Sequence, residues 1–131
     1  MKIEVLKQFS IFLPNRPGAL SRLTKLIGDQ GINIRGIASE VRDDSGMVRI
    51  AVDDKADLSA VLSANGFASI EASLVSIEVA DKPGELYRVT KILADGHVNI
   101  TTVYGTALDS HPCRILVAVE NTSKARTLLE A

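Results

Sequence analysis

The chain offers few side chains of the kinds that act as nucleophiles, general bases or metal ligands. Its histidines are His97 and His111, and its single cysteine is Cys113. Two histidines and one cysteine could in principle bind a metal ion, but their spacing matches none of the recurrent zinc patterns. The carboxylates are scattered over expected turns and polar faces. The sequence therefore predicts no catalytic residues, no metal site and no cofactor site, and metal sensing through these three residues is the last of the alternatives.

The short loop at Pro17-Gly18, which leads into an expected helix, is a better candidate for a binding site than these side chains. We expect free N–H groups at Gly18, Ala19 and Leu20, with the positive end of the helix dipole behind them. Such a helix N-terminus suits a carboxylate or a phosphate. Gly18 has no side chain, so a ligand can approach the backbone closely. The glycines lack the spacing of a nucleotide-binding loop, so the loop indicates binding of a small anion and not of a nucleotide.

Asn33 follows this expected helix, and Asn99 follows a second helix with the same kind of loop before it. A primary amide offers both a donor and an acceptor, which suits the ammonium and carboxylate groups of an α-amino acid. We expect Asn33 to lie near the loop when two domains pair. The alternative is that both asparagines only bond the backbone of a turn, as asparagine often does.

The loop, the helix and the asparagine occur twice in the chain. Residues 15–34 align without a gap on residues 81–100, an offset of 66 from Pro17 to Pro83. Nine of the 20 aligned pairs are identical: Pro17/Pro83, Gly18/Gly84, Leu20/Leu86, Arg22/Arg88, Thr24/Thr90, Lys25/Lys91, Asp29/Asp95, Asn33/Asn99 and Ile34/Ile100. A repeat of this length predicts two copies of one small domain, at residues 1–73 and 74–131.

The elements that position these residues follow from apolar periodicity and from turn residues. In the first copy we expect a strand over 3–13, a helix carrying Leu20, Leu23, Leu26 and Ile27 that ends at Gly31, a strand over 32–41, a hairpin turn at 42–46, a strand with Val48, Ile50 and Val52, and a helix capped by Asp53-Asp54 that ends at Gly66. A β-prone run over 67–79 then holds the last strand of the first copy and the first strand of the second. In the second copy we expect a helix with Leu86, Val89, Ile92 and Leu93, a strand over 98–106, a turn around Asp109-Ser110-His111-Pro112, a strand with Ile115, Val117 and Val119, and a helix over 124–130.

Each copy thus follows the order β-α-β-β-α-β, which predicts an α/β sandwich of ferredoxin-like type with antiparallel sheets. The second copy lacks its last strand. An unpaired sheet edge tends to recruit a strand. We expect residues 2–6, or the same residues of a partner chain, to cover that edge; the alternative is that they only lengthen the first strand.

The composition excludes several classes of function. The chain of 131 residues has 15 basic and 16 acidic side chains and a net charge of −1. This balance argues against a nucleic-acid partner, and the chain has no Trp and few other aromatic residues with which a strand could stack bases. Its apolar runs are too short for a membrane helix, and Met1-Lys2-Ile3-Glu4 does not resemble a signal peptide. One cysteine suits a reducing compartment, so we expect a cytoplasmic protein without a membrane or nucleic-acid partner.

The motif Asn15-Arg16-Pro17-Gly18-Ala19-Leu20 with Gly31-Ile32-Asn33-Ile34 resembles the signature of the ACT domain, a small regulatory module that binds amino acids. The second copy, Asp81-Lys82-Pro83-Gly84-Glu85-Leu86 with Val98-Asn99-Ile100, resembles it again. The whole chain is similar to stand-alone tandem ACT-domain proteins, which have no catalytic domain. ACT domains pair side by side into one eight-stranded sheet with ligands at the domain interface. The resemblance implies a homodimeric, non-catalytic sensor of a small amino acid or related effector.

The resemblance also implies site residues. Carried over position by position, the ligand-binding set is Asn15, Arg16, Pro17, Gly18, Ala19, Leu20, Asn33, Ile34, Asp81, Gly84, Glu85, Leu86 and Asn99. In the serine-binding ACT domain of phosphoglycerate dehydrogenase a His precedes the loop Asn by two residues. Leu13 and Val79 stand at that position here, so a less polar side-chain pocket is expected. Gly18-Ala19-Leu20 also resembles an element of phenylalanine-binding ACT domains, but their Glu-Ser-Arg-Pro partner is absent.

The two copies differ in charge. Asp81 and Glu85 replace Asn15 and Ala19, and both bring negative charge to the second helix N-terminus. We therefore expect the first copy to be the better seat for a carboxylate. A rival interpretation is a regulatory subunit that docks on a biosynthetic enzyme, because residues 15–37 also resemble the small subunit of acetolactate synthase.

Overall fold

The structure is a computed structural model, and it describes residues 1–107 and 111–131. By internal contacts the chain divides into two compact units. Residues 7–72 form one of them, called the first unit below. Residues 1–6 together with 73–131 form the other, called the second unit. Residues 1–6, which we expected in the first domain, thus group with the second unit.

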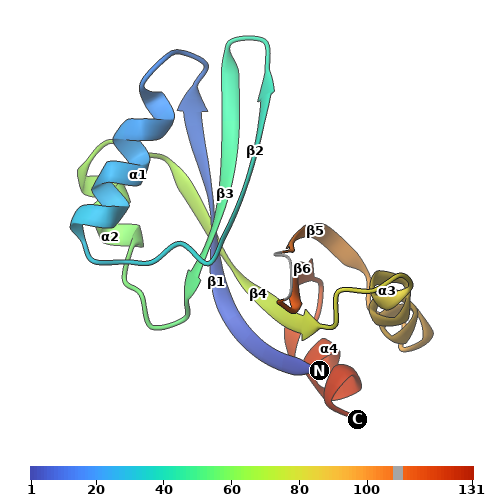
Figure 1. The fold of residues 1–131 in the computed structure, drawn as a ribbon. Helices are drawn as coiled ribbons and strands as arrows, with labels where there is room; N and C mark the ends of the chain where they lie inside the picture. The colour runs from blue at the N-terminus through green and yellow to red at the C-terminus, as the bar shows by residue number, and fades with distance from the viewer. Residues whose placement is uncertain (108–110) are drawn as a thin grey trace. The chain divides into compact units, whose positions relative to one another are not determined.

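The first unit has four strands and two helices. In spatial order its strands are β2 (Gly36–Arg42), β3 (Ser45–Asp53), β1 (Lys2–Pro14) and β4 (Ser69–Val79). The helices α1 (Ala19–Asp29) and α2 (Ser59–Ala64) lie together on one face of these strands (Figure 1). The strands β2 and β3 are antiparallel, and Arg42 pairs with Ser45 across a two-residue turn. This is the α/β arrangement with an antiparallel sheet that the alternating pattern predicts.

Apolar residues at alternate strand positions and at helical spacing build the first core. Phe9 and Ile11 of β1 are buried, as are Val48, Ile50 and Val52 of β3, and they meet Leu23, Ile27, Leu58, Leu62 and Phe67. Within α1 the residues Leu23 and Ile27 are fully buried, but Leu20 is 42% exposed, so it is not part of the core. The predicted inward face of this helix therefore begins one turn later than Leu20.

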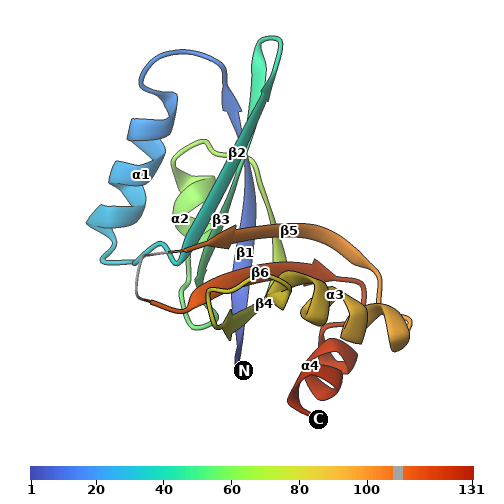
Figure 2. The same ribbon diagram turned by 45° about the vertical axis from the view of Figure 1, so that its right-hand side comes forward.

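The second unit repeats this order. Its strands lie in the order β1, β4, β6 (Cys113–Val119) and β5 (Ile100–Thr106), and its helices are α3 (Glu85–Asp95) and α4 (Thr122–Glu130). Both β4 and β5 pair with β6 in antiparallel fashion, and the helices flank these strands (Figure 2). The core consists of buried residues at alternate positions of β4 and β6 and at helical spacing, namely Val75, Ile77, Val79, Val89, Leu93, Val98, Ile115, Val117, Ala125 and Leu129.

The N-terminal residues supply the strand that the second copy lacks. The strand β1 is the neighbour of β4, and Ile3 packs against the second core. Leu6 is 2% exposed. Because residues 1–6 group with residues 73–131, the fourth strand of the second unit comes from the same chain. The expectation that these residues cover that edge agrees with their position.

Several boundaries differ from the predictions. The Asp53-Asp54 pair does not cap α2, which begins at Ser59 after Leu58 without a side-chain cap. The strand expected from residue 32 begins at Gly36, because 32–35 form a connection in which Ile32 and Ile34 pack on the core. Asp109 and Ser110 of the expected second turn lie outside the described residues. No helix in the described part of the chain is long and apolar enough to cross a membrane.

Candidate functional site

The Pro-Gly loop of the first unit ends at the N-terminus of α1. Gly18 is the N-cap residue with φ 88°, a conformation that glycine adopts without steric cost. No atom lies within 4 Å of the place where a Cβ would stand, so the backbone is open to a ligand. The N–H of Ala19 is not free, however, because it donates to the Arg16 carbonyl at 3.3 Å. The expectation of three free N–H groups is wrong for Ala19.

Asn15 fixes the loop to the neighbouring hairpin. Its side-chain Nδ2 donates to the Asp43 carbonyl at 2.9 Å, and its backbone N–H donates to the Asp44 carbonyl at 3.0 Å. Asp43 itself has φ 56°, as a tight turn requires. The Asn15 amide thus positions the loop, and its carbonyl oxygen remains as an acceptor.

A basic groove lies over the start of α1. It has a volume of about 420 Å³ and is lined by the loop, by Arg16 and Arg22, and by Phe67. Arg22 is held in place: Nη2 donates to the Asn65 carbonyl at 2.8 Å, and the guanidinium lies 4.5 Å from the centre of the Phe67 ring. None of the residues that line the groove is acidic. Two guanidinium groups and a helix N-terminus therefore face a common space with no carboxylate among its walls.

Asn33 follows the C-terminal end of the same helix, which ends at Asp29. The helix α1 has 11 residues, and these span about 16 Å at 1.5 Å per residue. Asn33 is exposed, and no other group in the described part of the chain bonds its side chain. Ile34 is half-buried against the core. One small ligand cannot reach both Asn33 and the loop of the same unit, so a shared site requires a second domain.

The helix N-terminus of the second unit carries its own carboxylate. Gly84 repeats the conformation of Gly18 with φ 91°, and Glu85 follows it. The Glu85 carboxylate accepts hydrogen bonds from Arg88 Nε at 3.0 Å and Nη2 at 2.5 Å, and Lys82 Nζ lies 3.7 Å away. The hydrogen bond from Arg88 holds the pKa of Glu85 below its usual value. The cations near this helix are thus paired internally.

The other two polar residues of the second motif also have partners. Asp81 Oδ1 accepts a hydrogen bond from Cys113 Sγ at 3.2 Å, and this bond raises the pKa of the Cys113 thiol. The side-chain amide of Asn99 donates to Glu120 Oε1 at 3.3 Å, and its backbone carbonyl accepts from the Glu120 N–H. Asn99 therefore links the start of β5 to Glu120, which follows β6. The side chain of Asn33 makes no such bond.

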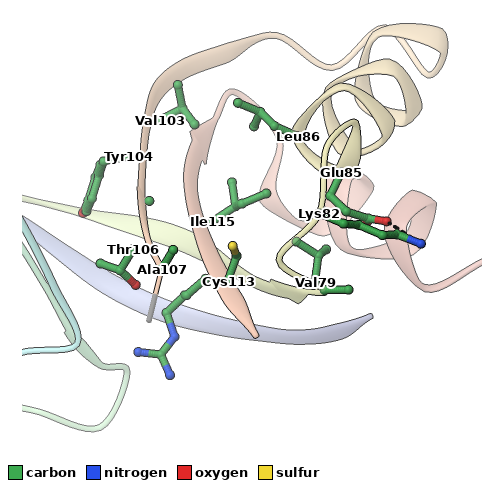
Figure 3. Close-up of a pocket in the computed structure, with 13 residues that line it drawn as sticks. Val79, Lys82, Glu85, Leu86, Val103, Tyr104, Thr106, Ala107, Cys113 and Ile115 are labelled. Carbon is green, nitrogen blue, oxygen red and sulfur yellow. Dashed lines mark ion pairs between the residues drawn. The ribbon is translucent and has the colours of Figure 1, made fainter. Parts of the chain in front are cut away.

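An apolar groove lies beside the second motif (Figure 3). It has a volume of about 410 Å³, and its walls come from β4, α3, β5 and β6. The residues at equivalent positions of the first unit line a groove of only about 130 Å³. The second groove is larger because its walls have smaller residues: Gly105 stands where the first unit has Ser39, and Ala107 where it has Val41.

The histidines take no part in these sites. His97 has φ 59° and replaces Gly31, which has φ 71°, so both occupy the left-handed corner after a helix. The 11 residues of α3 separate His97 from Cys113, which lies near the other end of that helix. No group of three or more His, Cys, Asp or Glu side chains that could hold a metal was found among the described residues.

Sequence reasoning misses two features of these sites. It names Arg22 only as one of the identical pairs of the repeat and gives it no role in binding. It misses the apolar groove because Val103 and Ile115 have the pattern of ordinary strand residues. The alignment of the two copies contains a signal for the groove, since Gly105 and Ala107 replace larger residues at alternate positions of the same strand pattern.

Comparisons with known proteins agree with this fold. Residues 7–64 match the family model of the ACT domain, so an ACT domain is present in the first unit. No curated protein sequence matches the chain. The structure is similar to protein BT0572 from Bacteroides thetaiotaomicron, with a TM-score of 0.85 and 28% identity over 98% of this chain and 88% of that chain.

Two further structures share the fold at lower identity. The regulatory subunit of aspartate kinase from Thermus thermophilus has a TM-score of 0.70 and 17% identity, with 100% of this chain and 97% of that chain covered. The aspartate kinase of Clostridium acetobutylicum, an allosteric enzyme, has a TM-score of 0.64 and 15% identity, and this chain corresponds to 33% of it. The first unit thus contains an ACT domain, and the chain shares its α/β fold with these structures.

Proposed function

We propose that this protein is a non-catalytic regulatory protein of two ACT-type domains that binds a small amino acid or a related effector. The basic groove over α1 is the observation on which the proposal rests. A free carboxylate placed there would accept hydrogen bonds from Arg22 and from the helix N-terminus. The ACT domain over residues 7–64 and the regulatory proteins of similar fold support the same interpretation.

The effector contacts would come from two domains. The loop residues Arg16 and Gly18, together with Arg22, would hold the carboxylate in one domain, and Asn33 of another would bind the ammonium group or the carboxylate. This division follows from the length of α1, which keeps Asn33 and the loop of one unit about 16 Å apart.

A homodimer would supply the second domain. In the first unit β2 is an edge strand, and its residues Ile37 and Val41 are 45% and 57% exposed. Exposed apolar side chains on an unpaired edge favour pairing with another strand. Two copies that pair along β2 would bring the loop of one chain toward the other chain.

The second candidate is a subunit that docks on a biosynthetic enzyme, and it is compatible with effector binding. The same exposed β2 edge supports it, because an enzyme could cover the edge instead of a second copy. The fold shared with a separate regulatory subunit of aspartate kinase also favours it. Purification of the tagged protein from its own cells, followed by mass spectrometry, would reveal such an enzyme.

The first test is a thermal-shift screen against the twenty amino acids at millimolar concentration. A ligand at 100 times its Kd stabilises the folded state by about 2.7 kcal/mol. For a domain of this size the melting temperature then rises by roughly 3–8 °C. The absence of any shift would count against the effector site and favour the subunit interpretation.

Two pairs of variants locate the site of any hit. Arg22→Ala removes a charge-assisted hydrogen bond and is expected to weaken binding about ten-fold or more, whereas Arg88→Ala, the matched control in the second unit, leaves it unchanged. Asn33→Ala is expected to weaken binding more than Asn99→Ala. Calorimetry measures all four. Equal losses in the members of each pair would contradict the assignment to the first motif.

A further inference from the structure

One asparagine of the chain, Asn65, is followed by a glycine. A backbone nitrogen that follows asparagine can attack the carbon of the side-chain amide. Glycine has no side chain, so Gly66 leaves this attack unhindered and gives the backbone the freedom to reach it. The other asparagines precede larger residues: Asn15, Asn33, Asn99 and Asn121. The sequence therefore favours Asn65 over the others as a site of this reaction.

The reaction is a deamidation that needs only water. The Gly66 nitrogen forms a bond to Asn65 Cγ, and the bond from Cγ to Nδ2 breaks. The proton that the Gly66 nitrogen loses returns through solvent to the leaving nitrogen, so ammonia departs and a cyclic imide remains. Water then opens the imide at either of its carbonyl groups. The products are aspartate and isoaspartate at position 65, and both carry a carboxylate.

In the folded chain both reacting groups are bonded elsewhere. Asn65 is the C-cap residue of α2, and its Nδ2 donates to the Val61 carbonyl at 2.8 Å. The Gly66 N–H donates to the Ser63 carbonyl at 3.1 Å. The first bond turns the side-chain amide back toward the helix, and the second keeps the attacking nitrogen protonated and engaged. The closed cap therefore protects Asn65.

Burial next to the cap keeps it closed. The Phe67 N–H donates to the Leu62 carbonyl at 2.9 Å, and Gly66 has φ 81°, so the helix ends in a Schellman motif. Leu62 and Phe67 are both buried in the first core, which supplies the apolar contact that accompanies this motif. Asn65 and Gly66 are themselves exposed. Water thus has access to the site, and the reaction waits only for the cap to open.

The product would place a negative charge among cations. Arg22 Nη2 donates to the Asn65 carbonyl at 2.8 Å, and Arg22, Lys25 and Asn65 line a crevice of about 190 Å³. Lys25 is already paired with Asp29, which lines the same crevice. Arg22 also lines the basic groove over α1. A carboxylate at position 65 therefore has Arg22 as its nearest cation without a carboxylate partner, and it would compete there with a ligand.

We propose that Asn65 is a site of spontaneous deamidation, that opening of the α2 C-cap sets its rate, and that the product carboxylate pairs with Arg22. The reaction goes beyond the proposed function, because it requires no ligand. Its effect on the basic groove rests on the proposed function: the new carboxylate occupies Arg22 as Glu85 occupies Arg88. Deamidation then closes the carboxylate seat as the protein ages.

The first test follows deamidation of the full chain in mildly alkaline buffer, with and without guanidinium chloride, by mass spectrometry of its peptides. In denaturant Asn65 is expected to react before the other asparagines. In the folded chain it should react at least about ten-fold more slowly, because two hydrogen bonds must first break. Equal rates in the two states would overturn the proposal, and so would an earlier reaction at another asparagine.

Two matched variants test the cap. Ala64 and Ala94 are exposed residues in the last turns of α2 and α3. Ala64→Gly weakens the end of α2 without changing the reacting residues, so the folded chain should deamidate at Asn65 about four-fold faster. Ala94→Gly is the control and should leave this rate unchanged. An unchanged rate in Ala64→Gly, or the same acceleration in both variants, would overturn the role of the cap.

The pairing with Arg22 is tested without a ligand. Asn65→Asp carries the charge of one product from the start. Replacing the guanidinium in the same chain, by Arg22→Gln, should raise the pKa of the new carboxyl group, which NMR titration measures. An unchanged pKa would contradict the pairing.

The effect on the groove is tested with the amino acid found in the screen. Asn65→Asp should bind it about ten-fold more weakly. Asn121→Asp adds the same charge at the N-cap of α4, where aspartate also caps, and should bind it normally. Equal affinities would overturn the effect on the groove. If the screen finds no ligand, only the proposed function fails, because the deamidation rates and the pKa are measured without one.

Discussion

The N-termini of α1 and α3 have the same backbone conformation but carry different charges. Gly18 and Gly84 have nearly the same φ, 88° and 91°, and each precedes an 11-residue helix. In the first unit Ala19 follows the glycine, and Arg22 is held by the Asn65 carbonyl and the Phe67 ring. In the second unit Glu85 follows it and binds the equivalent Arg88. The arginine thus lines an open groove in the first unit and pairs with a carboxylate of the protein itself in the second.

The comparison teaches that a repeated motif can keep its fold and lose its chemistry. The identical pairs Thr24/Thr90 and Lys25/Lys91 serve the helix: both threonines bond carbonyls one turn back, and both lysines pair with an aspartate four residues on. These bonds are equal in the two units. Three of the pairs that differ, Asn15/Asp81, Arg16/Lys82 and Ala19/Glu85, lie at the loop, where a ligand would bind.

Substitutions in the two cores should have the largest effects on the free energy of unfolding, and these effects should be similar in the two units. Ile27 and Leu93 are equivalent residues, and both are fully buried. Ile27→Ala and Leu93→Ala should each lower the free energy of unfolding by about 2–5 kcal/mol, since each leaves a cavity. Chemical denaturation measures both values. A loss below about 1 kcal/mol at one position would show that its unit does not depend on that core.

A smaller effect is expected at the two loop glycines. Alanine at Gly18 or Gly84 must adopt a positive φ, so each substitution should destabilise the protein by about 1–2 kcal/mol. Gly28 lies inside α1 with open space around it, and Gly28→Ala should instead stabilise by up to about 1 kcal/mol. Thermal unfolding of the three variants checks the signs. A neutral Gly84→Ala would break the equivalence of the two loops.

At the corners after α1 and α3, substitutions should change the free energy of unfolding by about 1 kcal/mol or less. His97 adopts φ 59°, where a residue other than glycine is strained, and Gly31 adopts φ 71°. His97→Gly should therefore stabilise slightly, and Gly31→Ala should destabilise by about 1 kcal/mol. Denaturant midpoints give both values. Destabilisation by His97→Gly would reveal a role for the imidazole.

The smallest effect concerns Cys113, which has no counterpart thiol in the first unit. Its bond to Asp81 raises the thiol pKa, so at about pH 8 a smaller fraction is thiolate than in an unperturbed cysteine. Asp81→Asn removes the negative charge and lowers the pKa, and alkylation by iodoacetamide should become a few times faster. Mass spectrometry follows the rate. Unchanged or slower alkylation would contradict the contact.

Much of this architecture could be predicted from the sequence, and the failures have physical causes. Alternation identifies the buried faces of β1 and β3, and Gly31 and Gly66 follow their helices as expected, both in the left-handed conformation. The predicted cap of α2 is wrong because Leu58, five residues after Asp53, enters the core and delays the helix. At this helix the burial of Leu58 decides where the helix begins, and the capping preference of Asp53-Asp54 does not.

The site is harder to predict than the fold. The loop backbone follows from Pro-Gly, but the position of the Arg22 side chain depends on Asn65 and Phe67, which lie more than 40 residues further on. The distance between Asn15 and Asn33 follows from α1 once its length is known. The groove of the second unit depends on the absence of side-chain atoms at Gly105 and Ala107, which no pattern of apolar residues reveals.

The central claim is that Ala19 leaves a carboxylate seat open in the first unit, while Glu85 closes it in the second. Ala19→Glu copies the second unit into the first and should pair with Arg22 as Glu85 pairs with Arg88. Calorimetry with the amino acid found in the screen should then show binding lost or at least about ten-fold weaker, with the melting temperature of the free protein preserved. Undiminished binding to Ala19→Glu would contradict the claim.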